Sequence, residues 1–584
     1  MQRISRSQLL VFAVAGAATS GVASAQTFVN TEIDLGGTGI TSFVPDNGPA
    51  AAVEWADYDN DGDLDLIVTG IGGDFVPGQS FPFFTRTTVY RNNGDDTFSA
   101  NISTLPEASS AAAKWLDFDG DGDTDLVLSG YDDAPFTTIF ENRGNGQFQN
   151  TFADLIDLIS GSIDVGDYDN DGDQDILHIG RNGSSFTRIY RNDGDGEFAI
   201  VDPDLAQVAA GDAAFVDYDN DGDLDIFLSG LDFAEQAATI LYRNDDGQFV
   251  DAGAGFPQLF SSAADFGDVD NDGDLDVVLT GVPNEFAEAE SYILENLGDG
   301  SFQDAGFDGI SVFNGEAAFG DHDNDGDLDL LIAGVSSVFS PQELIELYEN
   351  DGAGQFTPVA NTGLPRGIQI FRWGDYDNDG DLDLVAIGDP FTDEDGDGED
   401  DSSNVPDTQI FRNTTISTPA IPGAPDNLTA SASSDGLVTF SWDAPSDASG
   451  PVTHNLRVGT EPGAGDIVAA MNDPQLGTRL VAASGNVDLN TEWTIEGLPE
   501  GSYYWSVQAI TSSGQATAFA AEQSVDVVPG APNADLTGDG LVNTSDVFML
   551  LASWGDAGVV PGADFNGDGV VNAEDLFILL SQWG

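Results

Sequence analysis

Apolar and polar residues alternate in short runs along residues 27–414, a pattern that predicts β-strands rather than helices. The repeating unit begins with an apolar stretch such as Ala51–Trp55, passes through an acidic loop, and continues as a second strand, Leu64–Thr69. A third strand, Thr87–Arg91, and a tight Asn/Gly/Asp turn lead to a fourth strand that starts at Phe98. Each unit is therefore predicted to contain four short strands.

The acidic loop recurs at intervals of 50 to 60 residues, starting at Asp57, Asp117, Asp167, Asp217, Asp268, Asp321 and Asp375. A period near 50 residues with strand-like content indicates a propeller or a solenoid. The seventh unit lacks its fourth strand, and Thr27–Thr31 has the pattern of the missing one. A solenoid gives no reason why the N-terminal segment should carry the strand that the last unit lacks. The sequence predicts a mainly β protein built on a seven-bladed β-propeller that is closed by its N-terminal strand.

The acidic loop carries five aspartates in nine residues, as in Asp57–Asp65. Two carboxylates about 5 Å apart repel by roughly 3 kcal/mol at an effective dielectric constant of about 20, so the loop needs a countercharge. Aspartates at positions 1, 3, 5 and 9, around a glycine at position 6, suit Ca²⁺, which takes six to eight oxygen ligands. We expect side-chain ligands at those four positions and a backbone carbonyl ligand at position 7.

The ligands expected in the propeller are Asp57, Asp59, Asp61, Asp63 and Asp65; Asp117, Asp119, Asp121, Asp123 and Asp125; Asp167, Asp169, Asp171, Asp173 and Asp175; Asp217, Asp219, Asp221, Asp223 and Asp225; Asp268, Asp270, Asp272, Asp274 and Asp276; Asp321, Asp323, Asp325, Asp327 and Asp329; and Asp375, Asp377, Asp379, Asp381 and Asp383.

The C-terminal segment 535–584 contains two twelve-residue loops, each followed by an apolar helix, Val547–Trp554 and Leu576–Trp583. Oxygen ligands at positions 1, 3, 5, 9 and 12, with a carbonyl at position 7, are typical of calcium loops. The expected ligands are Asp535, Thr537, Asp539, Leu541, Asn543 and Asp546, and then Asp564, Asn566, Asp568, Val570, Asn572 and Asp575. We therefore expect about seven Ca²⁺ ions in the propeller and two in the tail.

The remaining segments complete the predicted domain order. Residues 1–25 have a basic start, an apolar centre and an Ala-x-Ala-like end, which predicts a signal peptide. Alternating strands without acidic loops predict a β-sandwich between two linkers. The predicted domains are 1–25 (signal), 27–414 (propeller), 415–424 (linker), 425–528 (sandwich), 529–534 (linker) and 535–584 (paired calcium loops).

Charge and cysteine content narrow the functional classes. The formal net charge of −88 argues against nucleic acid and anionic membranes as partners. No stretch after residue 25 is long and apolar enough for a membrane span. An exported protein with no cysteine has no disulfides, so metal loops are the expected staples. We expect a secreted or cell-surface bacterial protein.

The repeats resemble the FG-GAP/VCBS family, whose propellers include the integrin α heads. The resemblance covers residues 27–414 and rests on the seven acidic loops. It implies a calcium ion in the loop that joins the first two strands of each blade. The segment with Trp442, and with Tyr503 just after the Leu498–Pro499 corner, resembles a fibronectin type III sandwich, which implies a spacer.

The duplicated C-terminal loops resemble a type I dockerin, an α-helical calcium-binding module over about residues 533–584. The resemblance implies docking to a cohesin-like or cell-surface partner. The residues that would touch a cohesin, Thr544–Ser545 and Ala573–Glu574, differ between the two halves, which puts binding in two alternative orientations in question.

No nucleophilic triad is visible, and the histidines His178, His322 and His454 are interpreted as structural. Arg91, Arg191, Arg243 and Arg412 share one repeat position and are expected to pair with carboxylates of neighbouring blades. Loose candidates for a lyase are Arg86, Arg188, Arg366 and Arg372. Aromatics around Phe75–Phe84 could contact a ligand or cover a neighbouring blade, and the acidic insert 393–401 could hold a cation or be solvated.

Two function classes stay open. The first is a secreted, multi-calcium adhesion or recognition protein whose propeller binds a protein or glycan on the variable face opposite the acidic loops. Its tail would dock to a partner or act as a sorting tag. The alternative is an extracellular enzyme that degrades polysaccharide, a lyase or a glycosidase, or its carbohydrate-binding accessory subunit.

Overall fold

A computed structural model gives the architecture of most of the chain. It describes residues 27–31, 33, 35, 40–41, 51–72, 84–101, 105–388, 407–415, 421–528 and 534–583, with gaps at 145, 195, 197, 202, 246, 285, 338–341, 434–435, 472–477, 535, 538–540, 556–559, 561, 566–568 and 582. The expected signal segment, the acidic insert 393–401 and the aromatics of 75–83 lie outside the described residues.

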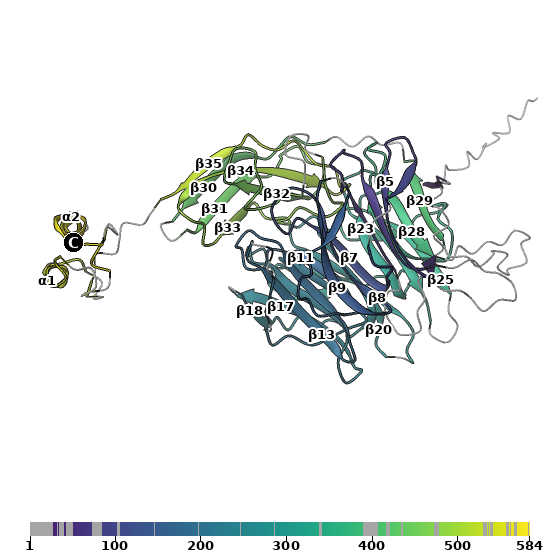
Figure 1. Ribbon diagram of the computed structural model, residues 1–584. Coiled ribbons are helices and arrows are strands. Elements are labelled where there is room, and N and C mark those ends of the chain that lie inside the picture. The colour runs from purple at the N-terminus through teal and green to yellow at the C-terminus, as the bar shows by residue number, and fades with distance from the viewer. Residues whose placement is uncertain are drawn as a thin grey trace, which may run out of the picture.

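Strands dominate the described chain, as the alternating pattern predicts (Figure 1). The first strands of the units are β3 (Ala52–Ala56), β7 (Ser109–Leu116), β11 (Ile163–Gly166), β15 (Ala213–Val216), β19 (Phe260–Gly267), β23 (Phe313–Gly320) and β27 (Ile368–Gly374). The second strands are β4 (Asp65–Gly72), β8 (Asp125–Asp132), β12 (Asp175–Arg181), β16 (Asp225–Leu231), β20 (Asp276–Val282), β24 (Asp329–Val335) and β28 (Asp383–Gly388). Every second strand begins at the ninth-position aspartate of its acidic loop.

The outer half of each unit follows the same order. The third strands are β5 (Phe84–Asn92), β9 (Ala134–Asn142), β13 (Ser185–Asn192), β17 (Ala237–Asp245), β21 (Glu290–Asn296), β25 (Glu343–Asn350) and β29 (Asp407–Asn413). The fourth strands are β6 (Phe98–Asn101), β10 (Phe148–Asn150), β14 (Phe198–Val201), β18 (Gln248–Asp251), β22 (Phe302–Asp304) and β26 (Phe356–Pro358). The mainly β class and the four-stranded unit are confirmed.

In the described part of the chain these strands form seven antiparallel sheets, called here sheets one to seven in chain order. In sheet seven the outer strand comes from the other end of the chain. There β1 (Phe28–Asn30) pairs with β29, and Phe28 lies opposite Asn413. A short strand, β2 (Ile40–Thr41), adds to β4 in sheet one.

The first strands contact one another in turn. The neighbouring pairs are β3 with β7, β7 with β11, β11 with β15, β19 with β23, β23 with β27 and β27 with β3, while β19 contacts β16 of sheet four. Apolar clusters fill the spaces between adjacent sheets. The central strands of each sheet are therefore buried on both faces. Between sheets one and seven, for example, the rings of Trp55 and Tyr376 stack with centroids 6.4 Å apart.

Two three-stranded sheets form the sandwich over residues 426–527. One consists of β30 (Asp426–Ala432), β31 (Val438–Asp443) and β33 (Glu492–Ile495), and the other of β32 (Val452–Gly459), β34 (Gly501–Thr511) and β35 (Gln523–Val527). Phe440 and Trp505 pack between them with ring centroids 4.9 Å apart. The Tyr503 hydroxyl donates a hydrogen bond to the Pro499 carbonyl, 2.8 Å away, as in the tyrosine corner of many sandwiches.

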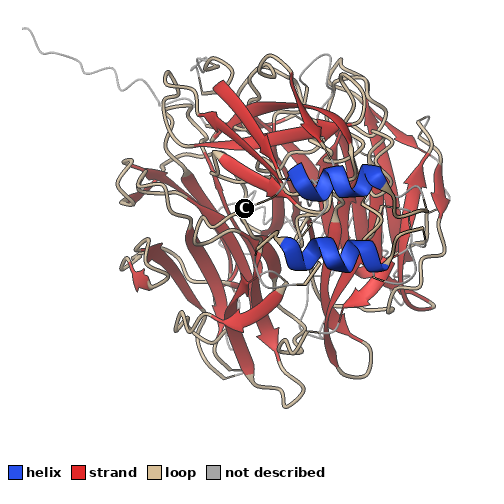
Figure 2. Cartoon of the chain, turned by 90° about the vertical axis from the view of Figure 1, so that its left-hand side faces the viewer, coloured by secondary structure: helices blue, strands red, loops and turns tan. Residues whose placement is uncertain are grey.

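The described helices are a single pair, α1 (Thr544–Ala552) and α2 (Ala573–Ser581) (Figure 2). Both begin three residues earlier than predicted, directly after an asparagine. Asn543 caps α1 by accepting a hydrogen bond from the Ser545 amide, and Asp546 accepts one from the Asn543 amide. Leu550 and Leu579 are fully buried between the helices and their loops. No helix in the described segments is long and apolar enough to cross a membrane.

Candidate metal centres

Each acidic loop joins the first and second strands of its sheet and folds around two residues with left-handed backbone. The sixth-position glycines have φ between +86° and +103°, and Gly62 is at +92°. A residue with a side chain is strained at such angles, which explains the glycine. The fourth position is also left-handed, at +58° in Asn60, and asparagine tolerates this region better than most residues.

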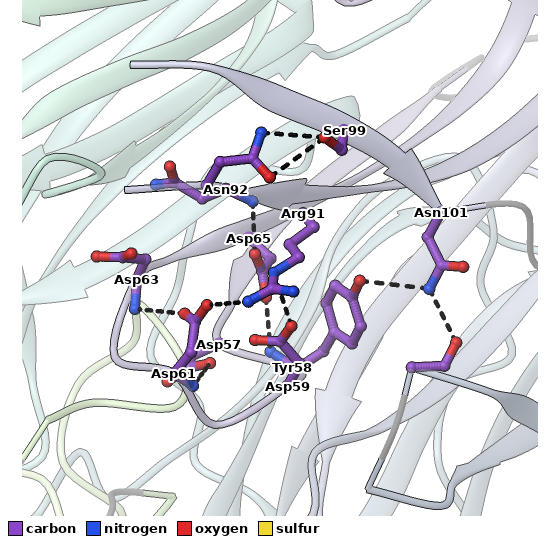
Figure 3. A network of polar contacts seen from close by, with 12 residues as sticks. Asp57, Tyr58, Asp59, Asp61, Asp63, Asp65, Arg91, Asn92, Ser99 and Asn101 are labelled. Atoms are coloured by element: carbon purple, nitrogen blue, oxygen red, sulfur yellow. Dashed lines mark hydrogen bonds and ion pairs between the residues drawn. The ribbon is translucent and has the colours of Figure 1, made fainter. Parts of the chain in front are cut away.

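Backbone amides orient the carboxylates (Figure 3). In the first loop, Asp57 accepts hydrogen bonds from the amides of Asp61 at 3.0 Å and Gly62 at 2.7 Å. Asp65 accepts from the amides of Tyr58 at 3.1 Å and Asn92 at 2.7 Å. The first-position aspartates of the other loops repeat the contacts of Asp57. The loops are thus held in one shape by the backbone.

Carboxylate oxygens gather at the centre of the loops. One oxygen from each of Asp57, Asp59 and Asp61 lies within 4.8 Å of the other two, and in loops two, three and four the corresponding group comes from positions 1, 3 and 9. The third-position Oδ1 atom is buried without a hydrogen-bond partner in Asp59, Asp169, Asp219, Asp270 and Asp377. A buried polar oxygen without a partner is costly, and a cation bound in the loop would supply a partner for these atoms. An all-oxygen donor set fits Ca²⁺.

Burial disfavours the charged form of these carboxyls. It raises the pKa of Asp57 to about 6 and that of Asp65 to about 9, although backbone hydrogen bonds act in the opposite direction. Burial likewise raises the pKa of Asp125, Asp225 and Asp383 to about 9. A divalent cation would reverse this balance, because its charge favours the ionised carboxylates.

A third-strand asparagine, missed in the sequence analysis as part of the site, connects each loop to the next sheet. In sheet one the Asn92 amide donates to Asp65, and its side-chain Nδ2 donates to the carbonyls of Leu64 (3.2 Å) and Tyr376 (2.7 Å). We call the equivalent residues the tie asparagines: Asn92, Asn142, Asn192, Asn244, Asn296, Asn350 and Asn413. Each reaches the second-position carbonyl of the preceding loop, and Asn92 joins sheet one to sheet seven.

A second contact between neighbouring loops uses positions 4 and 7. The Asn378 side chain of loop seven donates to Oδ1 of Asp63 in loop one, 2.9 Å away, and Asn60 donates to Asp123 at 2.9 Å. Position 7 was expected to offer only its carbonyl to the metal. The contact between loops gives a reason for an aspartate side chain there.

The repeat-position arginines pair mainly with carboxylates of their own sheet, in the acidic loop or in the turn after the third strand, so the expected pairing with neighbouring blades is wrong for most of them. Arg91 Nε lies 2.9 Å from Asp59, and its Nη2 lies 2.6 Å from Asp61 (Figure 3). Arg412 Nε lies 2.7 Å from Asp377 of its own loop, and its Nη2 also contacts Asp96 of sheet one.

In the tail, the twelfth-position aspartates close the loops onto the helices. Asp546 accepts hydrogen bonds from the Thr537 amide and hydroxyl, and Asp575 accepts from the amides of Phe565 and Asn572. Asp564 Oδ1 is buried without a hydrogen-bond partner. Of the expected ligands, Asp535, Asp539, Asn566 and Asp568 lie outside the described residues.

The sandwich packs directly on the acidic loops. The Asn490 side chain donates to Asp217 at 2.9 Å, and the Ser512 hydroxyl donates to Asp321 at 2.9 Å. Backbone contacts add to this, because the Asp57 amide donates to the Leu480 carbonyl at 2.9 Å. The segment expected to be a spacer therefore covers part of the loop face.

A chamber of about 900 Å³ is lined by residues of the first strands and of the sandwich. Several of its charged side chains are paired: Arg372 lies 3.1 Å from Glu54 and 2.7 Å from Glu316, and Lys114 lies 3.6 Å from Asp164. Arg188 instead donates to Gln207 and Arg86 to Thr88. Arg86, Arg188 and Arg372, the arginines considered for a lyase, thus have different partners and do not contact one another in these interactions.

Comparison with known sequences gives a partial match. The family model described as an FG-GAP-like repeat matches five overlapping segments, residues 117–178, 167–228, 217–279, 268–332 and 321–386. The chain carries FG-GAP-like repeats. With the four-stranded sheets, this match supports a β-propeller. No curated protein matches the chain.

Solved structures show only distant likeness. The extracellular domain of a hybrid two-component system from B. thetaiotaomicron is 12% identical with a TM-score of 0.34, over 85% of this chain and 57% of that one. A mutant of the Aleuria aurantia lectin, in complex with α-methyl-L-fucoside, is 13% identical with a TM-score of 0.33, over 56% of this chain and 98% of the lectin. At TM-scores this low they carry no argument about the architecture or ligand of this chain.

Proposed function

We propose that this chain is an extracellular calcium-binding recognition protein. In this proposal the seven sheets are the blades of one ring, closed by β1, and Ca²⁺ in the acidic loops makes the ring rigid. The tail would hold two further ions and dock to a cohesin-like or cell-surface partner. The observation that carries the proposal is the repeated buried carboxylate oxygen without a hydrogen-bond partner at position 3 of the loops.

The residues that would hold each ion are the aspartates at positions 1, 3, 5 and 9, with the carbonyl at position 7. Bound Ca²⁺ supplies the countercharge that lets several buried carboxylates ionise together. The chain's own part is to fix these oxygens in place. The backbone amides orient positions 1 and 9, and the tie asparagines join neighbouring loops.

The face opposite the acidic loops is the proposed binding face. The sandwich occupies part of the loop face, whereas the connections between second and third strands lie at the other end of the sheets. Large exposed aromatics occur on that far face, with Phe233 80% and Phe286 75% exposed in two of those connections, and Phe152 85% exposed after β10. Such rings suit stacking on a sugar or seating of a peptide.

Chelation tests the calcium part of the proposal. Excess chelator should lower the melting temperature of the full chain by about 10 °C or more, because the carboxylates then lose their countercharge. The measurement is thermal unfolding monitored by circular dichroism. As the control, addition of excess Ca²⁺ should restore the original melting temperature. An unchanged melt in chelator would rule the proposal out.

Ligand binding needs a separate measurement. The full chain should bind particular members of a glycan and protein array in the presence of Ca²⁺. Phe233→Ala and Phe286→Ala should weaken that binding without lowering the melting temperature, since both side chains are exposed. Asp526 is an exposed residue of the sandwich and serves as the comparison. If Asp526→Ala abolishes binding while the two phenylalanine variants bind normally, the ligand site is not on the proposed face.

A further inference from the structure

One position beside every acidic loop carries either a positive or a negative charge. It is the third-strand residue directly before the tie asparagine. This position holds arginine in sheets one, three, four and seven and glutamate in sheets two, five and six: Arg91, Arg191, Arg243 and Arg412, and Glu141, Glu295 and Glu349. The tie asparagine fixes the register of this position, because its amide is bonded to the ninth-position aspartate in every sheet.

In sheets one and seven the guanidinium contacts loop carboxylates directly, and in sheets three and four it lies farther from them. Arg91 contacts both Asp59 and Asp61, at 2.9 and 2.6 Å, and Arg412 contacts Asp377 at 2.7 Å. Arg191 lies 3.9 Å from Asp169 and closer, at 2.9 Å, to Asp193. Arg243 lies 2.8 Å from Asp245, and its charge also acts on Asp219. Each guanidinium lowers the negative charge beside its loop, most directly in sheets one and seven. In sheets three and four, Asp193 and Asp245 partly offset it.

In the glutamate sheets the same position adds to the negative charge. Glu141 acts as a like charge on the third-position Asp119, and Glu295 does so on Asp270. Glu141 is also paired with Arg143, whose Nε and Nη2 lie 3.1 Å from its two oxygens, so its charge is partly offset. Sheet six differs at a second place as well, because a titratable residue, His322, stands at position 2 of its loop and contacts Asp329, whereas sheet five has the uncharged Val269 there. Sheet five therefore gives the clearest contrast with the arginine sheets.

We infer that this third-strand position divides the seven loops into two calcium-affinity classes. The glutamate loops, which start at Asp117, Asp268 and Asp321, bind Ca²⁺ more tightly than the arginine loops, which start at Asp57, Asp167, Asp217 and Asp375. The inference rests on the proposed calcium function and specifies which sites fill first. The chain would then keep its tight sites occupied while the arginine loops respond to changes in external Ca²⁺.

The size of the effect follows from the exposure of the charges. The side chains of Arg91 and Arg191 are 47% and 39% exposed, so water screens them strongly. Removing one such charge next to a divalent ion should change the dissociation constant on the order of tenfold at low salt, and less at high salt. The difference between the classes should therefore shrink as the ionic strength rises.

Calorimetric titration of the calcium-free full chain tests this inference. Arg191→Gln should tighten one of the weaker sites by about tenfold, and Glu295→Gln should move one ion from the tight phase to the weak phase. The matched control is Arg188→Gln, which removes the same charge from the same strand, β13, but from a residue bonded to Gln207 rather than placed beside the loop. The control should leave the titration unchanged.

The outcomes separate the inference from the function on which it rests. Two calcium-binding phases in the titration, shifted by the variants as described, support the inference. The difference in affinity between the two phases should also decrease as the salt concentration rises. Calcium binding with one uniform affinity, or equal effects of Arg191→Gln and Arg188→Gln, overturns the two classes and leaves the metal sites in place. A titration with no calcium uptake overturns the proposed function itself.

Discussion

Burial decides the protonation of individual residues in the sheets, and His178 is the clearest case outside the acidic loops. It lies in β12 with 1% of its surface exposed, and burial lowers its pKa from 6.5 to about 3. Its Nδ1 atom is buried without a hydrogen-bond partner. The interpretation of His178 as structural, made from its place in a strand, agrees with this environment, because a neutral imidazole fills space in the core.

His178 should make stability depend on pH. Below about pH 6.5, His178 is protonated in the unfolded chain but stays neutral in the folded state. The free energy of unfolding therefore decreases as the pH falls from about 6.5 toward the folded pKa. His178→Leu should remove this loss and gain about 2 kcal/mol relative to the parent between pH 6.5 and pH 5. Urea unfolding at pH 7.5 and pH 5, in constant Ca²⁺, measures the difference. A difference that does not change with pH would contradict the assignment.

At the scale of elements, the tie asparagines explain how separate sheets become one body. Each one donates from its backbone to its own loop and from its side chain to the preceding loop. These groups are buried, so losing the donor leaves carbonyl oxygens without partners. The contact from Asn92 to the Tyr376 carbonyl is the version that spans sheets one and seven.

Replacement of Asn92 tests this role directly. Asn92→Ala removes the bonds to Leu64 and Tyr376 and should lower the free energy of unfolding by about 2–4 kcal/mol. The neighbouring Asn93 is exposed, and its side chain bonds within the same hairpin, to Thr97 and Ser99, so Asn93→Ala should cost less than about 1 kcal/mol. Denaturant unfolding in excess Ca²⁺ compares the two. Equal losses would show that the link between sheets contributes little.

The elements themselves could be predicted from sequence, whereas their connections could not. Strand alternation and the fixed loop spacing place β3, β4 and β5 to within a few residues, because each depends on local pattern. The asparagine before the turn is present in every repeat, but the sequence pattern indicates only its place in the turn. Its partner carbonyl lies 284 residues away in the case of Asn92, and no local pattern reports such a contact.

At the scale of the whole molecule, the position of the sandwich on the acidic loops could not be predicted from the sequence either. Its strands follow from alternation, but its contact with the acidic loops depends on single residues such as Asn490 and Ser512. Both donate to first-position aspartates, which are proposed calcium ligands. Calcium occupancy and sandwich docking should therefore be coupled, since an ion holds these carboxylates ionised and in place.

Hydrogen exchange measures that coupling. Removal of Ca²⁺ should speed exchange of the Asp57 and Glu496 amides, which donate to the carbonyls of Leu480 and Asn170 across this contact. Amides inside the sandwich, such as that of Val507, buried in β34, should keep their protection and serve as the control. Equal acceleration in both places would indicate general unfolding rather than release of the sandwich.

The most direct test of the central claim is a crystal structure of the full chain grown with millimolar Ca²⁺, with the ions located by their anomalous signal. The account predicts an ion among the carboxylates of each of the seven acidic loops, within one closed ring of seven sheets. Empty loops at that concentration, or a ring with a different number of sheets, would contradict it.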